Sequence, residues 1–375
     1  MNRNYDPARG NRGPKTLAAI VLTACSLAAC ASGPGKEPAA PPEPKAAIVL
    51  ERGTASLDLS APGAGLSGVA FSDGALRLAP GATTGEYLSP IVSLPLFNWL
   101  VPSWRAETPG GSSVRIAFQA WMDGAWSAWY GMGTWSAKPA SERSSDALGR
   151  VDVDTLILMR DARLLRCRIT LAAGPGGESP VLFSAGFATR NYLSPRPPDK
   201  AGIAALPDID LPVPSRSQMV EDPSISGRIC SPTSLSMVLA ARGVDLPTAA
   251  VAAGCYDNGE GIFGNWPFNV AFAGSRGLPA RVDYFGSLSD IAAELSAGNL
   301  VVASVKFGPG ELAGAPINST SGHLMVVRGF AHRDGKTYAL VNDPASPDVS
   351  GVPREYLAEQ FAGAWTGVVY VIGKP

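Results

Sequence analysis

Histidine is scarce in this chain, and its scarcity narrows the chemistry that the protein can perform. The 375 residues include only two histidines, His323 and His332. Two histidines leave little for a multi-histidine zinc site, and neither an HExxH nor a CxxC pattern occurs. We therefore expect no metal and no other cofactor.

An excess of charge is also lacking, since 31 basic residues stand against 32 acidic ones and no strongly basic block occurs. Nucleic acid is therefore not an expected partner. The apolar run near the N-terminus, residues 17–29, is too short to span a bilayer and matches the core of a signal peptide. Glycine and proline, by contrast, are plentiful, with 42 and 33 residues, which favours turns over long helices.

The N-terminal segment, residues 1–30, indicates where the protein works. Basic residues precede the apolar run, which ends in the letters LAAC at Cys30. This ending resembles a bacterial lipobox, which implies that Cys30 is lipidated and becomes the mature N-terminus. A rival box ends at Cys25, but cleavage there would leave an apolar core of only about nine residues. An ordinary cleaved secretory signal is the alternative.

Residues 31–47 are rich in proline, alanine and glycine and have no capacity to bury a core. We interpret them as a tether between a lipid anchor in the membrane and the folded part of a cell-envelope protein. Ala31 is not the aspartate that, by resemblance to Gram-negative lipoproteins, would retain the protein at the inner membrane. The outer membrane is therefore expected in a Gram-negative cell. The rest of the chain is long enough for two domains.

Residues 48–193 are predicted to form an all-β sandwich. Short alternating runs at residues 56–59, 75–78, 114–120, 165–171 and 181–185 are separated by turn signals such as Asp73-Gly74 and Asp123-Gly124. Cys167 alternates with arginines in the fourth run and is expected to face the core.

Six of the eight tryptophans lie between Trp99 and Trp135. Exposed indoles would stack on sugar rings and make this domain a cell-wall glycan module, whereas buried ones would fill the core of the sandwich. We favour core packing, since Trp126, Trp129 and Trp135 cannot all share one strand face.

Residues 205–375 are predicted to be an α/β domain that begins with a short amphipathic helix behind Cys230. Ser231 can cap this helix, Pro232 suits its first position and Gly243 can end it. The partial positive charge at a helix N-terminus favours thiolate over thiol, so Cys230 is expected to be a nucleophile near neutral pH. Further helices are predicted at residues 266–275 and 288–297, and strands at residues 300–307, 324–330, 337–341 and 367–372.

His323 and then Asp343 follow the cysteine along the chain. His323 precedes an apolar run of strand character, whereas His332 lies beside the hairpin turn Asp334-Gly335. Antiparallel strands joined by that turn would place His323 and Asp343 side by side, so that the carboxylate orients the imidazole. Asn342 would point to the opposite face of the strand. An Asn-Asp-Pro turn without a catalytic part is the alternative.

Several of these stretches carry a resemblance to a known family. They are SRSQ with Gln218, CSPTSLSMVLAARG, GNWPFNVAFA, SGHLMVVRGF and VNDPA, and they are similar to the bacteriocin-processing, double-glycine leader peptidases, which have the papain-like cysteine peptidase fold. The resemblance implies that Cys230 is the nucleophile, His323 the general base and acid, and Asp343 the orienting carboxylate. It also implies that Gln218 donates its side-chain amide to the oxyanion.

The same resemblance implies that Asn265 and Trp266 lie near the substrate groove, with a structural role as the alternative. The chain departs from the family at Ser231, where glycine is common, and the added side chain puts substrate approach in question. PSWRAETPGGSSVRIAF and DGAWSAWYGMGTWS resemble a β-sandwich module that precedes such peptidases in secreted bacterial proteins. The expected fold class is therefore α+β, an all-β sandwich followed by a papain-like cysteine peptidase domain.

A cell-envelope thiol peptidase that acts on a peptide or protein substrate is the favoured function. A papain-fold amidase or acyl transferase would use the same groups, and the fold alone does not settle the reaction. A catalytically silent lipoprotein, binding glycan or peptide through its β-sandwich, is a third hypothesis. A redox or structural thiol protein is the fourth, because Cys230 and Cys255 would share an oxidising compartment and could pair.

Overall fold

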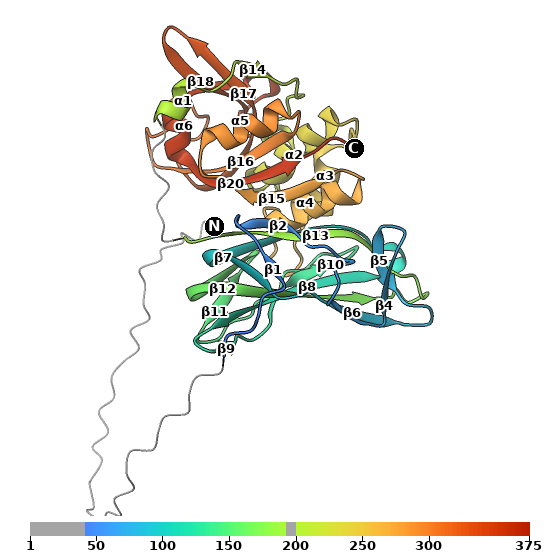
Figure 1. Ribbon diagram of the computed structural model, residues 1–375. Helices are drawn as coiled ribbons and strands as arrows, with labels where there is room; N and C mark the ends of the chain where they lie inside the picture. The colour runs from blue at the N-terminus through green and yellow to red at the C-terminus, as the bar shows by residue number, and fades with distance from the viewer. Residues whose placement is uncertain (1–41, 193–199) are drawn as a thin grey trace, which may run out of the picture. The chain divides into compact units, whose positions relative to one another are not determined.

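The structure is a computed structural model that describes residues 42–192 and 200–375 (Figure 1). Cys30 and most of the predicted tether lie outside the described residues, so lipidation stays a prediction. Residues 43–375 form one compact unit. Every helix within the described ranges falls short of the length and apolar character that a membrane crossing requires.

The N-terminal half forms a 13-stranded sheet, and its all-β character is as predicted. The strands are β1 (Ile48–Val49), β2 (Thr54–Ser56), β3 (Gly65–Ser67), β4 (Val69–Ser72), β5 (Ala75–Leu78), β6 (Thr84–Leu88), β7 (Val92–Glu107), β8 (Ser113–Met122), β9 (Ala125–Trp126), β10 (Tyr130–Trp135), β11 (Gly149–Asp152), β12 (Thr155–Ala172) and β13 (Val181–Arg190).

The long strand β12 joins the two layers of this half. Its C-terminal part pairs with β8 and β6, and its N-terminal part pairs with β7 and β11, with register shifts between. Phe118 of β8 and Phe187 of β13 belong to different layers, and their rings pack edge to face with centroids 5.9 Å apart. The layers of the sandwich are thus connected through one strand rather than separate.

Local sequence signals account for the turns and the alternation. Asp73-Gly74 and Asp123-Gly124 have positive φ at both residues, as a tight hairpin turn requires. Cys167 is 1% exposed and lies in the core between Leu165 and Ile169, as its alternation with arginines predicted. Burial raises the pKa of this thiol, so it stays protonated and unreactive.

The C-terminal half is an α/β domain with a seven-stranded sheet in the order β15-β20-β16-β17-β18-β19, to which β14 adds by pairing with β17. Its elements are α1 (Lys200–Ala204), β14 (Ile209–Asp210), η2 (Gln218–Val220), η3 (Ser226–Arg228), α2 (Cys230–Ala241), α3 (Thr248–Cys255), α4 (Trp266–Ser275), β15 (Ala280–Tyr284), α5 (Leu288–Ser296), β16 (Leu300–Phe307), β17 (Thr320–Arg333), β18 (Lys336–Asn342), η4 (Val349–Gly351), β19 (Pro353–Leu357), α6 (Ala358–Ala364) and β20 (Trp365–Ile372).

Both faces of this sheet are buried, which explains why its central strands read as continuous apolar runs. Val302, Val326 and Tyr370 pack on one face in the cluster that includes α2 and α4. Val301 and Val327 pack on the other face with residues of α5 and α6. The strands therefore lie between two helix layers (Figure 1).

The ends of the helices follow capping signals in part. Ser287 and Asp290 form a capping box at the start of α5, and Gly298 follows its end with φ 80°. Helix α2 begins at Cys230 itself, so Ser231 lies in the first turn and does not cap it. The expectation of an amphipathic helix is also wrong, because all residues from Ser231 to Leu239 are buried and α2 is a central helix.

Buried tryptophans join the two halves. Trp99 packs on Trp266 at 6.4 Å between ring centroids, and Trp104 and Trp135 each pack on Phe268 at about 6 Å. The three indoles of the N-terminal half are at most 5% exposed, and one hydrophobic cluster extends through both halves. Core packing is therefore right for these three, although the core that they fill is shared.

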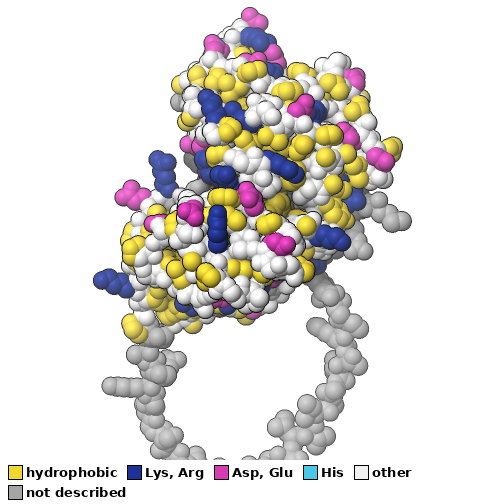
Figure 2. Space-filling model, turned by 90° about the vertical axis from the view of Figure 1, so that its right-hand side faces the viewer, with side chains coloured by type: hydrophobic (Ala, Val, Ile, Leu, Met, Phe, Trp, Pro, Cys, Tyr) yellow, Lys and Arg dark blue, Asp and Glu magenta, His cyan; other side chains and the backbone are white. Residues whose placement is uncertain are grey.

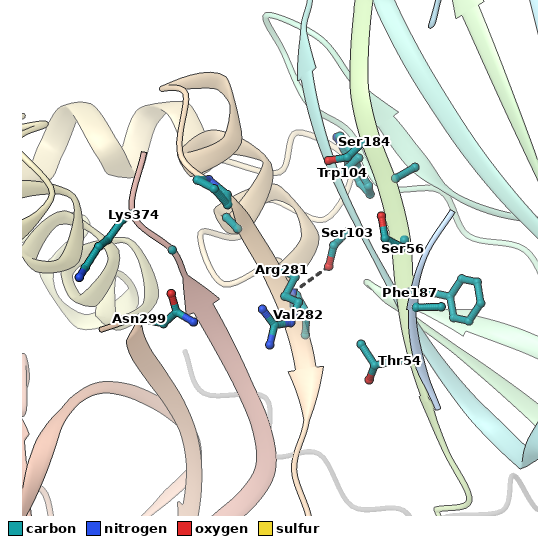
Figure 3. A pocket seen from close by; sticks show the side chains of 16 residues that line it. Thr54, Ser56, Ser103, Trp104, Ser184, Phe187, Arg281, Val282, Asn299 and Lys374 are labelled. Carbon is teal, nitrogen blue, oxygen red and sulfur yellow. Dashed lines mark hydrogen bonds between the residues drawn. The ribbon is translucent and has the colours of Figure 1, made fainter. Parts of the chain in front are cut away.

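Polar contacts cross the same seam. The backbone N–H of Val282 in β15 donates to Ser103 Oγ in β7 at 2.8 Å (Figure 3). Thr54 of β2 donates its hydroxyl to Asp283 at 2.6 Å. A pocket lies beside these contacts, lined by β2, β7 and β13 on one side and by β15 on the other.

The turn between β11 and β12 places the carboxylate of Asp154 against the N-terminus of helix α4. Val153 in this turn has φ 61°, a left-handed conformation that is strained for a β-branched residue. The next residue, Asp154, accepts a hydrogen bond from the backbone N–H of Trp266 at 2.8 Å. Burial raises the pKa of Asp154 to about 7, against the opposing effect of that N–H. The first turn of α4 is thus held by a side chain from the other half.

Candidate active site

Cys230 is partly exposed at the first position of helix α2. Burial by itself would raise the pKa of its thiol, but the hydrogen bond and charge of His323 outweigh it, helped by the backbone N–H groups of Leu324 and Ser231. The pKa of Cys230 is therefore lowered. A thiolate at this position is a competent nucleophile.

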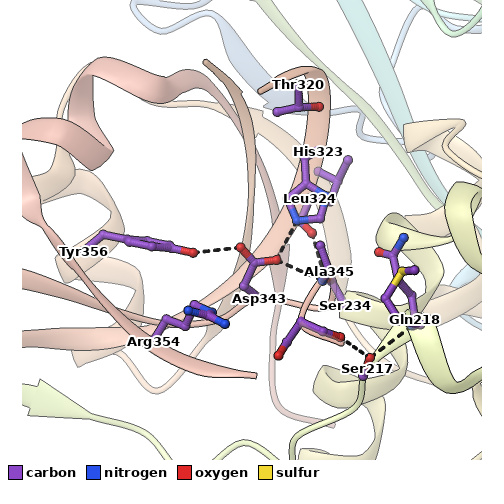
Figure 4. Close-up of polar contacts among 12 residues, drawn as sticks. Ser217, Gln218, Ser234, Thr320, His323, Leu324, Asp343, Ala345, Arg354 and Tyr356 are labelled. Atoms are coloured by element: carbon purple, nitrogen blue, oxygen red, sulfur yellow. Dashed lines mark hydrogen bonds and ion pairs between the residues drawn. The ribbon is translucent and has the colours of Figure 1, made fainter. Parts of the chain in front are cut away.

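His323 lies in β17 and is 3% exposed. Its Nε2 is 2.8 Å from Asp343 Oδ1 (Figure 4). The other ring nitrogen, Nδ1, is the one available to Cys230. Burial alone would lower the pKa of the imidazole, but the charge of Asp343 and the bonds to Asp343 and Cys230 raise it to about 10. The ring is therefore a cation at neutral pH and lies between the Asp343 carboxylate and the Cys230 sulfur.

Asp343 follows directly after β18 and has no exposed surface. Its Oδ1 also accepts the backbone N–H of Ala345 at 3.0 Å, and its Oδ2 accepts the hydroxyl of Tyr356 at 2.8 Å. Burial works against ionisation, yet His323, Ala345 and Tyr356 together lower the pKa of the carboxyl. The structure thus brings together three residues that the sequence separates by up to 113 positions.

The neighbouring candidates take other roles. Asn342 points away from Asp343, and its amide donates to the carbonyl oxygens of Val213 and Pro214. His332 lies at the hairpin turn, where its Nε2 bonds the carbonyl oxygen of Leu206 at 2.6 Å. Neither side chain contacts the thiol.

Gln218 begins the short helix η2 and is 5% exposed. Its Nε2 donates one hydrogen to the carbonyl oxygen of Ser226 at 2.7 Å, and an amide carries a second. The backbone N–H of Gln218 bonds the carbonyl oxygen of Pro344 at 2.9 Å, and Ser217 Oγ bonds that of Ser346. The segment that carries Gln218 is thus attached to the turn that follows Asp343.

Ser231 does not obstruct the thiol. It has no exposed surface, and its hydroxyl bonds the hydroxyl of Tyr370 in β20 at 2.8 Å. The side chain therefore points into the protein interior, where burial raises the pKa of Tyr370. The departure from the family's glycine adds a bond between α2 and the sheet.

Asn265 and Trp266, predicted near the substrate groove, lie at the seam between the halves. Asn265 is fully buried, caps α4 by accepting the N–H of Phe268, and donates to Asp257 at 2.9 Å. Trp266 packs on Trp99. Both side chains thus have structural contacts, and their place in a groove stays a prediction.

The remaining thiols of the described residues are buried away from Cys230. Cys255 and Cys230 are free thiols, as is Cys167, and burial raises the pKa of Cys255 well above its ordinary value. Within the described ranges, no three His, Cys, Asp or Glu side chains are grouped to hold a metal ion.

Tyr356 is the member of this site that the sequence did not reveal. It stands in the run VPREYLAEQ, which has no motif character, and it reaches Asp343 only because β19 pairs with β18. Without the register of those strands, no signal in the sequence connects the two residues.

A thiol on a central helix that meets an imidazole and a carboxylate on an antiparallel sheet defines the papain-like class of cysteine peptidases. Residues 210–372 match the model of the peptidase C39-like family, and residues 49–189 match that of the peptidase C39 N-terminal domain. The chain belongs to the peptidase C39-like family and is a cysteine-type peptidase.

The solved structures that resemble the chain each cover less than half of it. One is a double-glycine-motif protease from an AMS/PCAT transporter in complex with its leader peptide, 21% identical over 44% of this chain and 94% of that one, with a TM-score of 0.30. A C39-like peptidase from Bacillus anthracis is 19% identical over 45% and 98%, with a TM-score of 0.35. The peptidase domain of Streptococcus ComA is 17% identical over 44% and 98%, with a TM-score of 0.29. No curated protein matches.

Proposed function

We propose that this protein hydrolyses peptide bonds with Cys230 as nucleophile, His323 as general base and acid, and Asp343 as the orienting carboxylate. The observation that carries the proposal is the hydrogen bond from the His323 imidazole to the buried Asp343 carboxylate, together with the interaction of the imidazole with Cys230 that lowers the pKa of the thiol. Each member has the partner that its role needs: the thiol has a cation, and the cation has a fixed anion.

The reaction follows from these contacts. The Cys230 thiolate attacks the peptide carbonyl carbon, a C–S bond forms, and the carbonyl oxygen becomes an oxyanion. We assign to the second N–H of the Gln218 amide the role of donor to that oxygen. The imidazolium of His323 then gives its proton to the departing amine, and the C–N bond breaks. A water molecule, deprotonated by His323, attacks the thioester and releases the acid and the thiolate.

An amidase or acyl transferase is the alternative within the same chemistry. The first half-reaction would be identical, and only the leaving group or the acceptor of the acyl group would differ. Peptide-library profiling of residues 31–375, beside Cys230→Ala, separates these reactions because new amino termini, released ammonia and transferred acyl groups are different products. Undiminished hydrolysis by Cys230→Ala would refute the nucleophile.

A second measurement tests the charge state of the thiol. Iodoacetamide should label Cys230 faster than an ordinary thiol at pH 6, because the lowered pKa raises the thiolate fraction. The matched control is Cys255, whose raised pKa predicts inertness under the same conditions. An inert Cys230 would instead favour a catalytically silent binding protein or a structural thiol.

We further propose that the enzyme works in the cell envelope, anchored by a lipid on Cys30, and at the outer membrane in a Gram-negative cell. The LAAC ending of the apolar run supports this location. Acyl chains bind membranes by burying apolar surface, so the lipidated protein should resist extraction with salt and should partition into detergent. The Cys30→Ser variant, which has no acyl chains, should not partition into detergent. Intact Met1 in the cytosol would overturn the location.

Glycan contact through the N-terminal half is a second candidate function, favoured by three indoles on its surface. Trp121, Trp126 and Trp129 are half-buried, and Arg166 lies 4.4 Å from the centroid of Trp126. Figure 2 shows basic and acidic side chains scattered over the face in view, without a continuous patch of one sign. Binding of soluble cell-wall glycan that Trp126→Ala abolishes would support it, and no binding would exclude it.

A further inference from the structure

The carboxylate of Asp343 has no contact with solvent, so its orientation depends on protein donors alone. Oδ1 is shared between His323 Nε2 at 2.8 Å and the backbone N–H of Ala345 at 3.0 Å. Oδ2 has one hydrogen-bond partner in the described structure, the hydroxyl of Tyr356 at 2.8 Å (Figure 4). Removal of that hydroxyl would leave a buried charged oxygen unpaired and free the carboxylate to rotate.

Tyr356 is itself fixed by the fold. It is 1% exposed, and its strand pairs with β18 so that Tyr356 faces Ala339, while Pro353 faces Asn342 beside the carboxylate. Its ring belongs to the hydrophobic cluster on the α6 face of the sheet. The position of the hydroxyl is therefore set by core packing rather than by a mobile side chain.

We propose that Tyr356 is a positioning residue of the peptidase, which holds the Asp343 carboxylate in the one orientation that aligns His323 with Cys230. This inference rests on the proposed function. Ala345 and Tyr356 bind different oxygens, and two donors on two oxygens prevent rotation about the bond that carries the carboxylate. Oδ1 then stays directed at the imidazole.

The charges around the pair agree with this role. Burial, followed by the charge of Asp343, raises the pKa of Tyr356, so the phenol keeps its proton and acts only as a donor. The other charge acting on it is Arg354, whose guanidinium bonds the carbonyl oxygen of Gly314 at 2.8 Å. The tyrosine hydrogen bond also favours the ionised carboxyl, which is the form that stabilises the His323 cation.

Tyr356→Phe is the direct test, because it removes the hydroxyl and keeps the ring. We expect kcat to fall by about tenfold with little change in KM, since hydrogen bonds to charged groups are of that size. We also expect the acid limb of Cys230 alkylation to move to higher pH, because a misaligned imidazolium stabilises the thiolate less.

Tyr130→Phe is the matched control. Tyr130 is equally buried, and its hydroxyl donates to the carboxylate of Asp146 at 2.6 Å in the N-terminal half. It loses the same kind of bond away from the thiol, so it should affect stability and leave the alkylation profile unchanged. Identical pH profiles for the two variants would overturn the proposal.

A double-mutant cycle with Asp343→Asn keeps the inference testable if Tyr356→Phe also loses stability. With the carboxylate gone, adding Tyr356→Phe should change kcat by less than about twofold. Additive losses would show that Tyr356 acts elsewhere and would overturn the proposal. Failure of the proposed function itself has a different signature, namely turnover that survives in Cys230→Ala.

Discussion

Among single residues, the buried imidazole of His323 sets the charge of the whole site. Its raised pKa and the lowered pKa of Cys230 both favour the ion pair of imidazolium and thiolate. The stabilising effect of the His323 charge is fully present below its unfolded pKa of 6.5 and is lost as pH rises through about 10. That of Asp343 is present above 3.8 and is lost as pH falls through its lowered pKa.

Replacement of His323 by alanine removes both the proton carrier and the cation beside the sulfur. We expect His323→Ala to lower kcat/KM by about 10²–10⁴-fold and to slow alkylation of Cys230 at pH 6. Asp343→Asn should cost less, because the helix end and the imidazole still favour the thiolate. Stopped-flow alkylation and steady-state kinetics measure both. A greater loss in Asp343→Asn would contradict the roles of base and orienting carboxylate.

Cys230, His323 and Asp343 could be selected from the sequence because each follows or precedes a strong local signal. The cysteine stands before a helical pattern, the histidine before an apolar strand, and the aspartate after one. Tyr356 could not, because its role depends on strand register. The inward orientation of the Ser231 side chain could not be predicted either, because its hydrogen-bond partner Tyr370 lies 139 positions away in the sequence.

Among the elements, helix α4 links the two halves because the backbone N–H of its first residue, Trp266, donates to the carboxylate of Asp154. Asp154→Ala would leave the N–H of Trp266 buried without an acceptor, and we expect a loss of about 1–2 kcal/mol in the free energy of unfolding. Asp154→Asn retains an acceptor and should cost much less. Urea unfolding at pH 8 measures both.

The pH dependence gives a second criterion for the same contact. The raised pKa of Asp154 means that this carboxyl favours the folded state below 3.8, and that this contribution is lost as pH rises through about 7. Asp154→Asn should abolish this loss of stability with rising pH, because asparagine does not titrate. Equal losses in the alanine and asparagine variants would show instead that the charge itself holds the helix.

Elements with their own start and stop signals were predictable, and those defined by a neighbour were not. Helix α4 and strand β16 have the predicted bounds, since a buried run with clear ends marks each. Helix α3 lacks a side-chain cap, and β15 has the mixed sequence ARVDY. Strand β15 exists because it pairs with β20, and that pairing has no local signal.

At the scale of the molecule, one hydrophobic cluster contains residues of both the sandwich and the peptidase half. We expect a single cooperative unfolding transition for residues 43–375. Phe118→Leu, in the sandwich, should lower the free energy of unfolding by about 1 kcal/mol. The unfolding midpoints measured by tryptophan fluorescence and by protection of Cys230 from alkylation should then fall by the same amount. Two separate transitions in calorimetry would contradict a shared core.

The sequence indicated two parts from its length and from the change from short strand-like runs to helical patterns, and it indicated that tryptophans would be buried. It could not show which residues the tryptophans would pack against. The partners of Trp99 and Trp104 are Trp266 and Phe268, more than 160 positions away, and only the folded chain brings them together. Long-range contacts of this kind have no local pattern.

The attachment of Gln218 to the turn after Asp343 has a consequence for protein engineering. Because the backbone N–H of Gln218 bonds the carbonyl oxygen of Pro344 and Ser217 Oγ bonds that of Ser346, the segment that carries Gln218 and the turn after Asp343 are held together. Mutant libraries designed to change the cleavage preference should keep Ser217, Gln218 and the turn after Asp343 constant. Met219 and Val220, which follow Gln218 and are 47% and 60% exposed, are the positions to randomise, since their side chains are free to meet a different substrate without disturbing those contacts.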